Sequence, residues 1–136
     1  MVHMFLNGGG MKGGSLHHLI GGAPFIGPAT TLPIYRLHSV PLDGTADDHP
    51  ALQAAPPGTA GAAITGELYD IDLIVLRTSL LPAEPPDLEL GIVGLADGAE
   101  ALGMRLRDDC AGLPGLTDIT AHGSWRAYKA AKAEPR

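Results

Sequence analysis

The chain has 136 residues, which suits one domain that buries its own hydrophobic core. Its net charge is −6 and it has no basic stripe, which argues against nucleic-acid binding. The single cysteine, Cys110, excludes an internal disulfide and a CxxC metal site. Residues 1–10 lack the pattern of a signal peptide, and no apolar run approaches the roughly 20 residues of a membrane span. We therefore expect residues 1–136 to form one cytoplasmic domain with no nucleic-acid or membrane partner.

The first forty residues predict strands broken by glycine and proline. Residues 2–7 are apolar and end at glycine, which predicts a strand, and residues 15–20 favour a short helix after the glycine-rich loop. Residues 24–40 are rich in β-forming residues but contain Pro28 and Pro33, which confine strands to sheet edges or bends. Residues 41–58 have the strongest turn chemistry in the chain and predict a loop.

The middle of the chain predicts a strand and then a helix. Residues 60–71 form the strand, in which Gly66 suggests a bulge or a close backbone approach. Alternation places Glu67 on the face opposite Leu68, and we expect that face to be exposed. Residues 72–81 follow as a helix, which Asp72 can cap.

The last third predicts a hairpin and a terminal helix. Residues 88–95 and 101–106 are two apolar runs joined through Asp97-Gly98, a strong hairpin signal. Residues 124–133 form a helix with Ser124 as N-cap, and residues 134–136 should fray. Hairpin-linked strands with two or three short helices indicate an α+β fold, which we expect to be a small, mixed, mainly antiparallel β-barrel.

The glycine-rich loop does not match a nucleotide-binding motif. A phosphate loop requires GxxxxGK[ST], but Lys12 precedes Gly13 instead of following it. The formal GxGxxG spacing lacks the βαβ context of a dinucleotide site. Two interpretations stay open: a tight turn that needs positive φ at several positions, and a cradle whose backbone N–H groups bind a small carboxylate. The substrate-binding candidates are Asn7, Gly8, Gly9, Gly10, Met11, Lys12 and Gly13.

Metal and nucleophile chemistry have little support in the sequence. His17 and His18 are adjacent and would point about 100° apart on a helix, so they chelate one metal poorly. Cys110 follows two aspartates, which raise a thiol pKa. We expect neither a metal nor a cofactor. Trp125 and Tyr128 should share a helix face that docks onto the sheet, and Arg126 should pair with Asp118.

Four segments together resemble a known family. "PIYRLHSV", "GAAITGELYDI" and "ELGIVGLADG" are similar to the gamma-glutamylcyclotransferase-like fold, and "DITAHGSWRAY" is similar to the end of the allophanate hydrolase C-terminal domain. The resemblance spans residues 5–128 and implies a cavity at the glycine loop. From their composition, we expect residues 44–50 to form a solvated loop that covers this cavity. The resemblance also implies a small carboxylate ligand and a glutamate that acts as general acid/base. The amidase half of allophanate hydrolase has no counterpart in this sequence.

The resemblance leaves the acid and the reaction open. The cyclotransferase loop begins Tyr-Gly-Ser-Leu, whereas this loop begins Asn7-Gly8-Gly9-Gly10, which favours the allophanate hydrolase type. The first catalytic candidate is Glu89, which heads an apolar run whose flanks suggest burial at one end; the alternative is a solvated carboxylate at a strand edge. The second candidate is Glu84, which lies between prolines and which we expect to be exposed.

Three functions follow from these alternatives. The first is decarboxylation of a carbamate-type compound, and the second is cyclotransfer on a gamma-glutamyl amine. The third is a non-catalytic module that binds a small acid or an amidase partner. Half-exposed apolar strands also leave a homodimer open.

Overall fold

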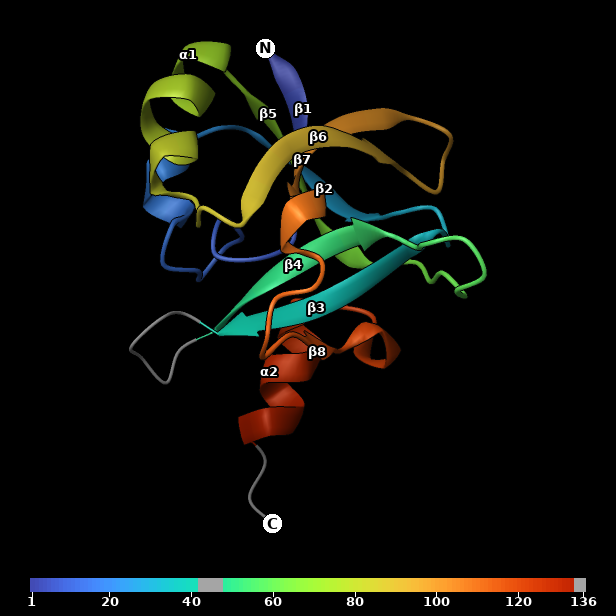
Figure 1. Ribbon diagram of the computed structural model, residues 1–136. Coiled ribbons are helices and arrows are strands. Elements are labelled where there is room, and N and C mark those ends of the chain that lie inside the picture. The colour runs from blue at the N-terminus through green and yellow to red at the C-terminus, as the bar shows by residue number, and fades with distance from the viewer. Residues whose placement is uncertain (42–47, 134–136) are drawn as a thin grey trace.

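The computed structural model describes residues 1–41 and 48–133. In these residues the strands form a five-stranded sheet, in the order β2-β5-β1-β7-β6, and a three-stranded sheet, in the order β4-β3-β8 (Figure 1). The β1–β7 pair is parallel and every other pair is antiparallel. The α+β class is confirmed. The predicted barrel is wrong, because the two sheets stay separate and each ends in edge strands.

The strands are β1 (Val2–Leu6), β2 (Phe25–Thr30), β3 (Tyr35–Pro41), β4 (Asp48–Ala54), β5 (Thr65–Ile71), β6 (Leu88–Gly94), β7 (Glu100–Leu106) and β8 (Thr117–Asp118). The helices are α1 (Leu73–Val75), which continues as a π-helical turn over Leu76–Leu80, and α2 (Trp125–Ala133). Short 3-10 turns occupy His17–Ile20, Leu81–Ala83, Asp108–Cys110 and Thr120–His122.

Local signals in the sequence located most of these elements. β6 and β7 pair over their full lengths, and Gly98 takes a φ of 90° in the connecting turn, which confirms the hairpin. The Asp72 side chain accepts a hydrogen bond from the Ile74 N–H at 2.8 Å, as expected of a helix cap. The Ser124 hydroxyl does the same for the Ala127 N–H at the start of α2.

The prediction of a loop over residues 41–58 is wrong, because β4 lies within it. β4 pairs with β3 along its whole length, from Tyr35 opposite Ala54 to Pro41 opposite Asp48. Pro50 is tolerated because β4 is an edge strand, where one missing N–H leaves the other side of the strand intact. The part of the expected covering segment before Asp48, and the expected frayed tail, lie outside the described residues.

Hydrophobic clusters cover both faces of the larger sheet. Along β1, Phe5 joins one cluster, whereas Met4 and Leu6 join the other, as the alternation of side chains requires. Trp125 packs against both clusters, and Tyr128 packs against the first, which confirms that α2 docks through these rings. The α1 segment lies on the opposite side of the molecule from α2 (Figure 1).

β5 lies inside the sheet, between β2 and β1, and a hydrophobic cluster covers each of its faces, with Leu68 in one and Tyr69 and Ile71 in the other. The expectation that Glu67 is exposed is therefore wrong: the residue is 6% exposed. Gly66 makes the predicted close approach, because a Cβ there would lie 2.4 Å from the carbonyl oxygen of Leu6. This approach joins β5 to the end of β1, where the glycine loop begins.

Candidate functional site

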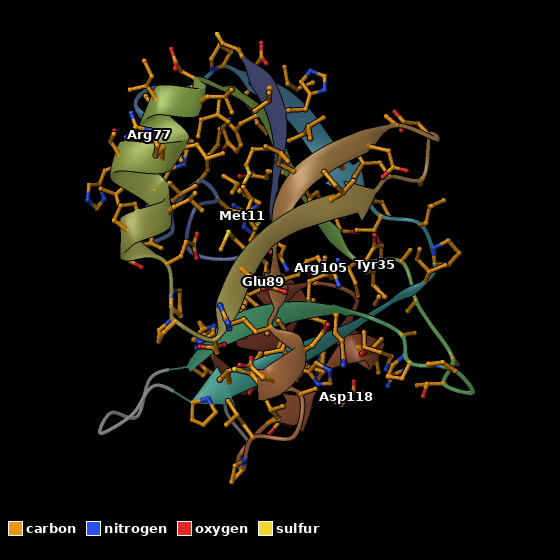
Figure 2. All side chains as sticks on the ribbon, turned by 45° about the horizontal axis from the view of Figure 1, so that its top comes forward. Met11, Tyr35, Arg77, Glu89, Arg105 and Asp118 are labelled. Carbon is orange, nitrogen blue, oxygen red and sulfur yellow. The ribbon has the colours of Figure 1, made fainter. Side chains whose placement is uncertain are left out.

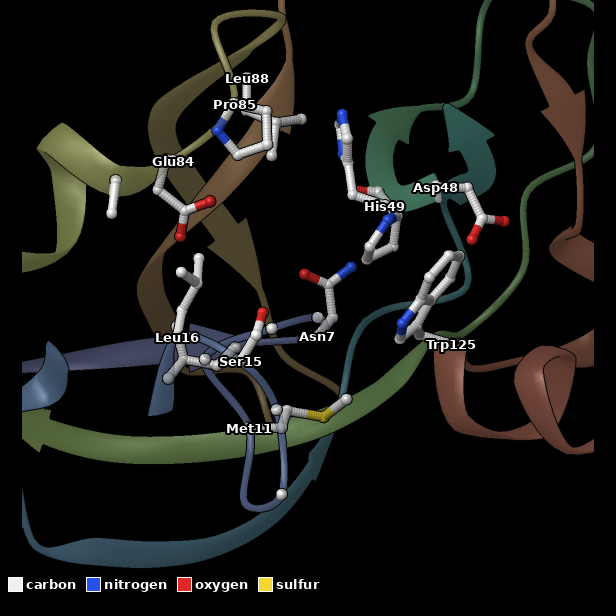
Figure 3. A pocket seen from close by; sticks show the side chains of 18 of the residues that line it. Asn7, Met11, Ser15, Leu16, Asp48, His49, Glu84, Pro85, Leu88 and Trp125 are labelled. Atoms are coloured by element: carbon white, nitrogen blue, oxygen red, sulfur yellow. The ribbon is translucent and has the colours of Figure 1, made fainter. Parts of the chain in front are cut away.

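A cavity of about 700 Å³ lies between the glycine loop, the start of β4, the segment before β6, and α2 (Figure 3). Side chains from all four segments point toward it. The fold therefore joins residues near the start, the middle and the end of the chain at one place. The lining residues are Leu6 to Leu16, Asp48, His49, Pro50, Ala83, Glu84, Pro85, Pro86, Leu88, Trp125, Arg126 and Lys129.

The glycine loop is a compact turn held by its own backbone. The Met11 N–H donates to the Gly8 carbonyl, and the Leu16 N–H donates to the Gly9 carbonyl at 2.9 Å. Gly14 must be glycine, because a Cβ there would lie 2.2 Å from the Gly9 oxygen. The tight-turn interpretation required positive φ at several loop positions. Only one of the described loop positions has it, Gly13, with a φ of 83°.

The first three glycines keep backbone donors free. No acceptor among the described residues bonds to the N–H groups of Gly8, Gly9 or Gly10. All three glycines line the cavity. Backbone N–H groups without a protein acceptor can bind an anion at low desolvation cost. The loop therefore offers donors of the kind that a carboxylate cradle needs.

An ion pair between the buried Glu67 carboxylate and the exposed Arg126 side chain clamps the tip of this loop. The Glu67 carboxylate accepts from the Lys12 N–H at 2.8 Å, from the Tyr69 hydroxyl at 2.9 Å and from Arg126 Nη1 at 3.2 Å. Arg126 Nη2 also donates to the Lys12 carbonyl at 2.7 Å. Both polar groups of Lys12's main chain are thus held by one ion pair, which ties the loop to β5 and to α2.

The contacts within this clamp shift the pKa values of Glu67 and Tyr69. Burial opposes ionisation of Glu67, but the donors of Lys12, Tyr69 and Arg126 outweigh it and hold the pKa of Glu67 below its usual value. Burial, together with the neighbouring Glu67 carboxylate, raises the pKa of Tyr69 to about 12. The expected Arg126–Asp118 pair is wrong. Asp118 instead accepts from Arg36 Nε at 3.1 Å, and Arg126 belongs to the clamp.

Glu84 contributes an acidic side chain to the cavity, next to the glycine loop. It follows the Leu81–Ala83 turn in extended backbone, and its carboxyl points toward the loop (Figure 3). The expectation that Glu84 is exposed is wrong, because its side chain is partly buried, and this burial raises the pKa of Glu84 to about 7. Within residues 1–41 and 48–133, no side chain or backbone group hydrogen-bonds to its carboxyl oxygens. At neutral pH this group can therefore both give and take a proton.

Asn7 lies between Glu84 and Trp125 in the cavity (Figure 3). It is 8% exposed, and its Nδ2 has no hydrogen-bond partner in the described part of the chain. A buried amide donor without an acceptor costs free energy, so it is a natural contact for a bound oxygen atom. The neighbouring Met11 is 4% exposed and contributes an apolar wall.

Two of the predicted site residues, Glu89 and Lys12, have surroundings that differ from those of the other site residues. Glu89 lies on the edge strand β6, is exposed and does not line the cavity, so the strand-edge alternative is right and burial at one end is wrong (Figure 2). The Lys12 ammonium lies 3.8 Å from the centroid of the Phe25 ring, a cation–π contact. What Lys12 adds to the loop is therefore its clamped backbone.

The start of β4 belongs to the segment 44–50 that we expected to cover the cavity, and its residues Asp48, His49 and Pro50 line the cavity as part of a strand instead of a loop. His49 lines the cavity and its Nε2 lies 3.0 Å from Asp87 Oδ1. Asp48 accepts from Ser39 at 2.7 Å and from Lys129 at 2.9 Å. Burial opposes its ionisation, but these donors outweigh it and lower the pKa of Asp48 to about 2. Asp48 thereby fastens α2 to β4 beside the cavity.

Metal-binding features are lacking in the described residues, which contain no cluster of three or more His, Cys, Asp or Glu side chains suited to an ion. His17 Nδ1 donates a hydrogen bond to the Gly10 carbonyl, 2.9 Å away. The pKa of Cys110 is raised by burial and by the neighbouring Asp109, as the sequence indicated. No helix in the described ranges is long and apolar enough to cross a bilayer.

Residues 2–130 match the family described as the allophanate hydrolase C-terminal domain, and the chain belongs to this family. A uropathogenic E. coli-specific protein is 30% identical, with a TM-score of 0.81 over 95% of each chain. The Kluyveromyces lactis allophanate hydrolase is 24% identical, with a TM-score of 0.85 over 96% of this chain and 21% of that one. A mouse AIG2-like protein is 20% identical, with a TM-score of 0.58 over 84% of each chain. No curated protein is a significant match.

The predicted family is thus confirmed, and the fold is shared with both groups that the sequence resembles. The chain corresponds to about a fifth of the length of the yeast allophanate hydrolase and to nearly all of the E. coli protein. The domain therefore occurs both within a long chain and as most of a short one.

Proposed function

We propose that this chain binds a small carboxylate at the glycine loop and decarboxylates a carbamate-type compound, with Glu84 as the proton donor. The observation that carries the proposal is the Glu84 carboxyl, whose pKa is raised to about 7 and which points into the same cavity as the loop. A general acid works best when its pKa lies near the operating pH. Glu89, the other candidate, is exposed and lies outside the cavity.

Neutral donors would hold the carboxylate. The Asn7 amide and the backbone N–H groups of Gly8, Gly9 and Gly10 supply hydrogen bonds without a full positive charge. A strong ion pair at the departing carboxylate would stabilise the substrate more than the transition state, in which that charge is leaving. Uncharged donors fix the orientation and avoid this penalty.

Proton transfer then completes the reaction. Protonated Glu84 donates its proton to the carbamate nitrogen while the C–N bond breaks and its electron pair stays on nitrogen. The carboxylate leaves as CO₂, the nitrogen leaves as the free amine, and water returns a proton to Glu84. About half of the Glu84 population is protonated near pH 7, so the acid form is available.

The test compares two glutamates by CO₂ release from ammonium carbamate, measured above the spontaneous rate. Glu84→Gln should lower the catalysed rate by at least about a hundredfold, since general acids contribute roughly 10² or more. Glu89→Gln, with an exposed side chain, should stay within about twofold of the wild type. Full activity in Glu84→Gln would contradict the assignment, and loss of activity in Glu89→Gln alone would transfer the role to Glu89.

A second candidate function is an amidase-associated module. It is favoured by the occurrence of this domain within the much longer Kluyveromyces lactis allophanate hydrolase. In that case the isolated chain should release no CO₂ but should bind a separately purified allophanate hydrolase amidase domain in titration calorimetry. Release of free amine from a gamma-glutamyl amine, with closure of the glutamyl part to its lactam, tests the cyclotransferase alternative, and we expect none.

A further inference from the structure

The cavity is much larger than a simple carbamate. A water molecule occupies about 30 Å³ in the liquid, so an ion of a few heavy atoms would leave most of a 700 Å³ cavity filled with water. Cavities of roughly 300–1,000 Å³ usually take ligands of drug-like size. The size therefore indicates a substrate with a substantial group beyond its acid end.

The walls of the cavity indicate the chemistry of that group. Apolar side chains make up much of the lining, including Met11, Pro50 and Pro85. Burial of an apolar group against such walls is favourable in proportion to the area removed from water. The apolar lining residues are Leu6, Met11, Leu16, Pro50, Ala83, Pro85, Pro86, Leu88 and Trp125.

The two ends of the cavity differ. Glu84 and Trp125 lie on opposite sides, with Asn7 between them (Figure 3). A ligand whose acid group contacts Glu84 and Asn7 would therefore extend its remaining atoms toward the indole. An indole ring is the side chain that best binds a flat, apolar group by stacking.

The indole is held in a fixed position. Trp125 packs against both hydrophobic clusters, and the Tyr128 ring centroid lies 5.4 Å from its own. Lys129 Nζ lies 5.2 Å from the indole centroid and is itself bonded to Asp48 at 2.9 Å. A ring fixed in this way loses little conformational entropy when a ligand binds to it.

We infer that the substrate is a carbamate whose nitrogen carries a flat apolar group, such as an aromatic ring, and that Trp125 selects this group. The inference rests on the proposed function for the acid end of the ligand. It adds a specificity-determining residue at the other end of the cavity. A carbamate of ammonia would then be a poor substrate relative to its aryl-substituted counterpart.

The test uses two stable carboxylates that differ in one phenyl group, phenylacetate and acetate. Phenylacetate should bind the wild type about tenfold more tightly in titration calorimetry. Because Trp125 is the only tryptophan, its fluorescence should change as phenylacetate saturates the site. Equal affinities, or tight binding with no fluorescence change, would overturn the inference.

Variants of Trp125 test whether the indole itself provides the preference for phenylacetate. Trp125→Ala should lose the preference for phenylacetate and keep the acetate affinity within about twofold, whereas Trp125→Phe should retain most of the preference. Since Trp125 also packs in the core, circular dichroism must show a folded variant, and the wild-type titrations decide the question if Trp125→Ala does not fold. A preference that survives Trp125→Ala would overturn the assignment.

The outcomes separate this inference from the proposed function. CO₂ release that depends on Glu84, combined with equal binding of the two carboxylates, would overturn the substrate class alone. Preferred binding of phenylacetate with no CO₂ release from any carbamate would overturn the proposed reaction and leave the binding preference in place.

Discussion

Removal of Glu67 should destabilise the protein more than removal of its ion-pair partner. In Glu67→Ala, the buried Tyr69 hydroxyl and the Lys12 N–H lose an acceptor that now lies 2.9 and 2.8 Å away, respectively. A hydrogen bond to a charged group contributes roughly 1.5–3 kcal/mol. Two such losses give an expected decrease of about 3 kcal/mol in the free energy of unfolding, or roughly 10 °C in Tm for a domain of this size.

Arg126→Ala should cost less, because the Arg126 side chain is 52% exposed and solvent screens its charge. We expect a decrease of about 1 kcal/mol, the usual upper value for exposed pairs. The variant also removes the hydrogen bond that anchors the glycine loop through the Lys12 carbonyl. Acetate affinity should therefore fall, although most of the stability is kept. In the Glu67→Ala background, Arg126→Ala should cost less than in the wild type, because the bond to Glu67 is already gone and the bond to the Lys12 carbonyl is left to lose.

Urea unfolding at pH 7, followed by circular dichroism, measures these differences. Glu89→Ala is the matched control, since Glu89 is exposed, and should change stability by less than about 0.5 kcal/mol. The pKa of Glu67 is lowered in the folded state, so its ionic contribution is complete above about 4.5 and is lost as pH falls through the lowered pKa. A Glu67→Ala variant as stable as Glu89→Ala, or strictly additive effects at Glu67 and Arg126, would refute the clamp.

Two further predictions concern Glu84 and Gly66. The folded-state pKa of Glu84 is raised from 4.5 to about 7, so the wild type loses stability as pH rises through this window. Glu84→Gln should escape the loss and be about 2 kcal/mol more stable than the wild type above pH 7 in thermal melts. An identical pH dependence in both proteins would contradict this. Gly66→Ala should cost about 3 kcal/mol, because its Cβ would meet the Leu6 carbonyl at 2.4 Å. Gly112→Ala, with open space around its Cβ, is the control and should be nearly neutral.

The sequence predicted elements whose signals are local. The Asp97-Gly98 hairpin, the Asp72 cap and the Ser124 cap each depend on residues a few positions apart, and each is confirmed. The family resemblance located the cavity at the glycine loop, which period and propensity alone could not do.

The errors concern contacts between distant segments. β4 was missed because proline and aspartate favour turns, whereas its pairing with β3 decides its conformation. The exposure of Glu67 was misjudged because alternation says which residues share a face, and not whether a second layer covers that face. The choice between Glu84 and Glu89 likewise depends on where the chain turns before β6, and no short pattern encodes that turn.

The Glu67–Arg126 clamp has a consequence for biosynthesis. Arg126 lies 114 positions after Lys12, whose carbonyl it binds. During translation the first strand and its glycine turn are made long before α2 exists, and at roughly 5–20 residues per second the delay amounts to about 6 to 23 seconds. Until then the turn lacks one of its two anchors, so a nascent chain stalled before α2 should contain an unfinished site.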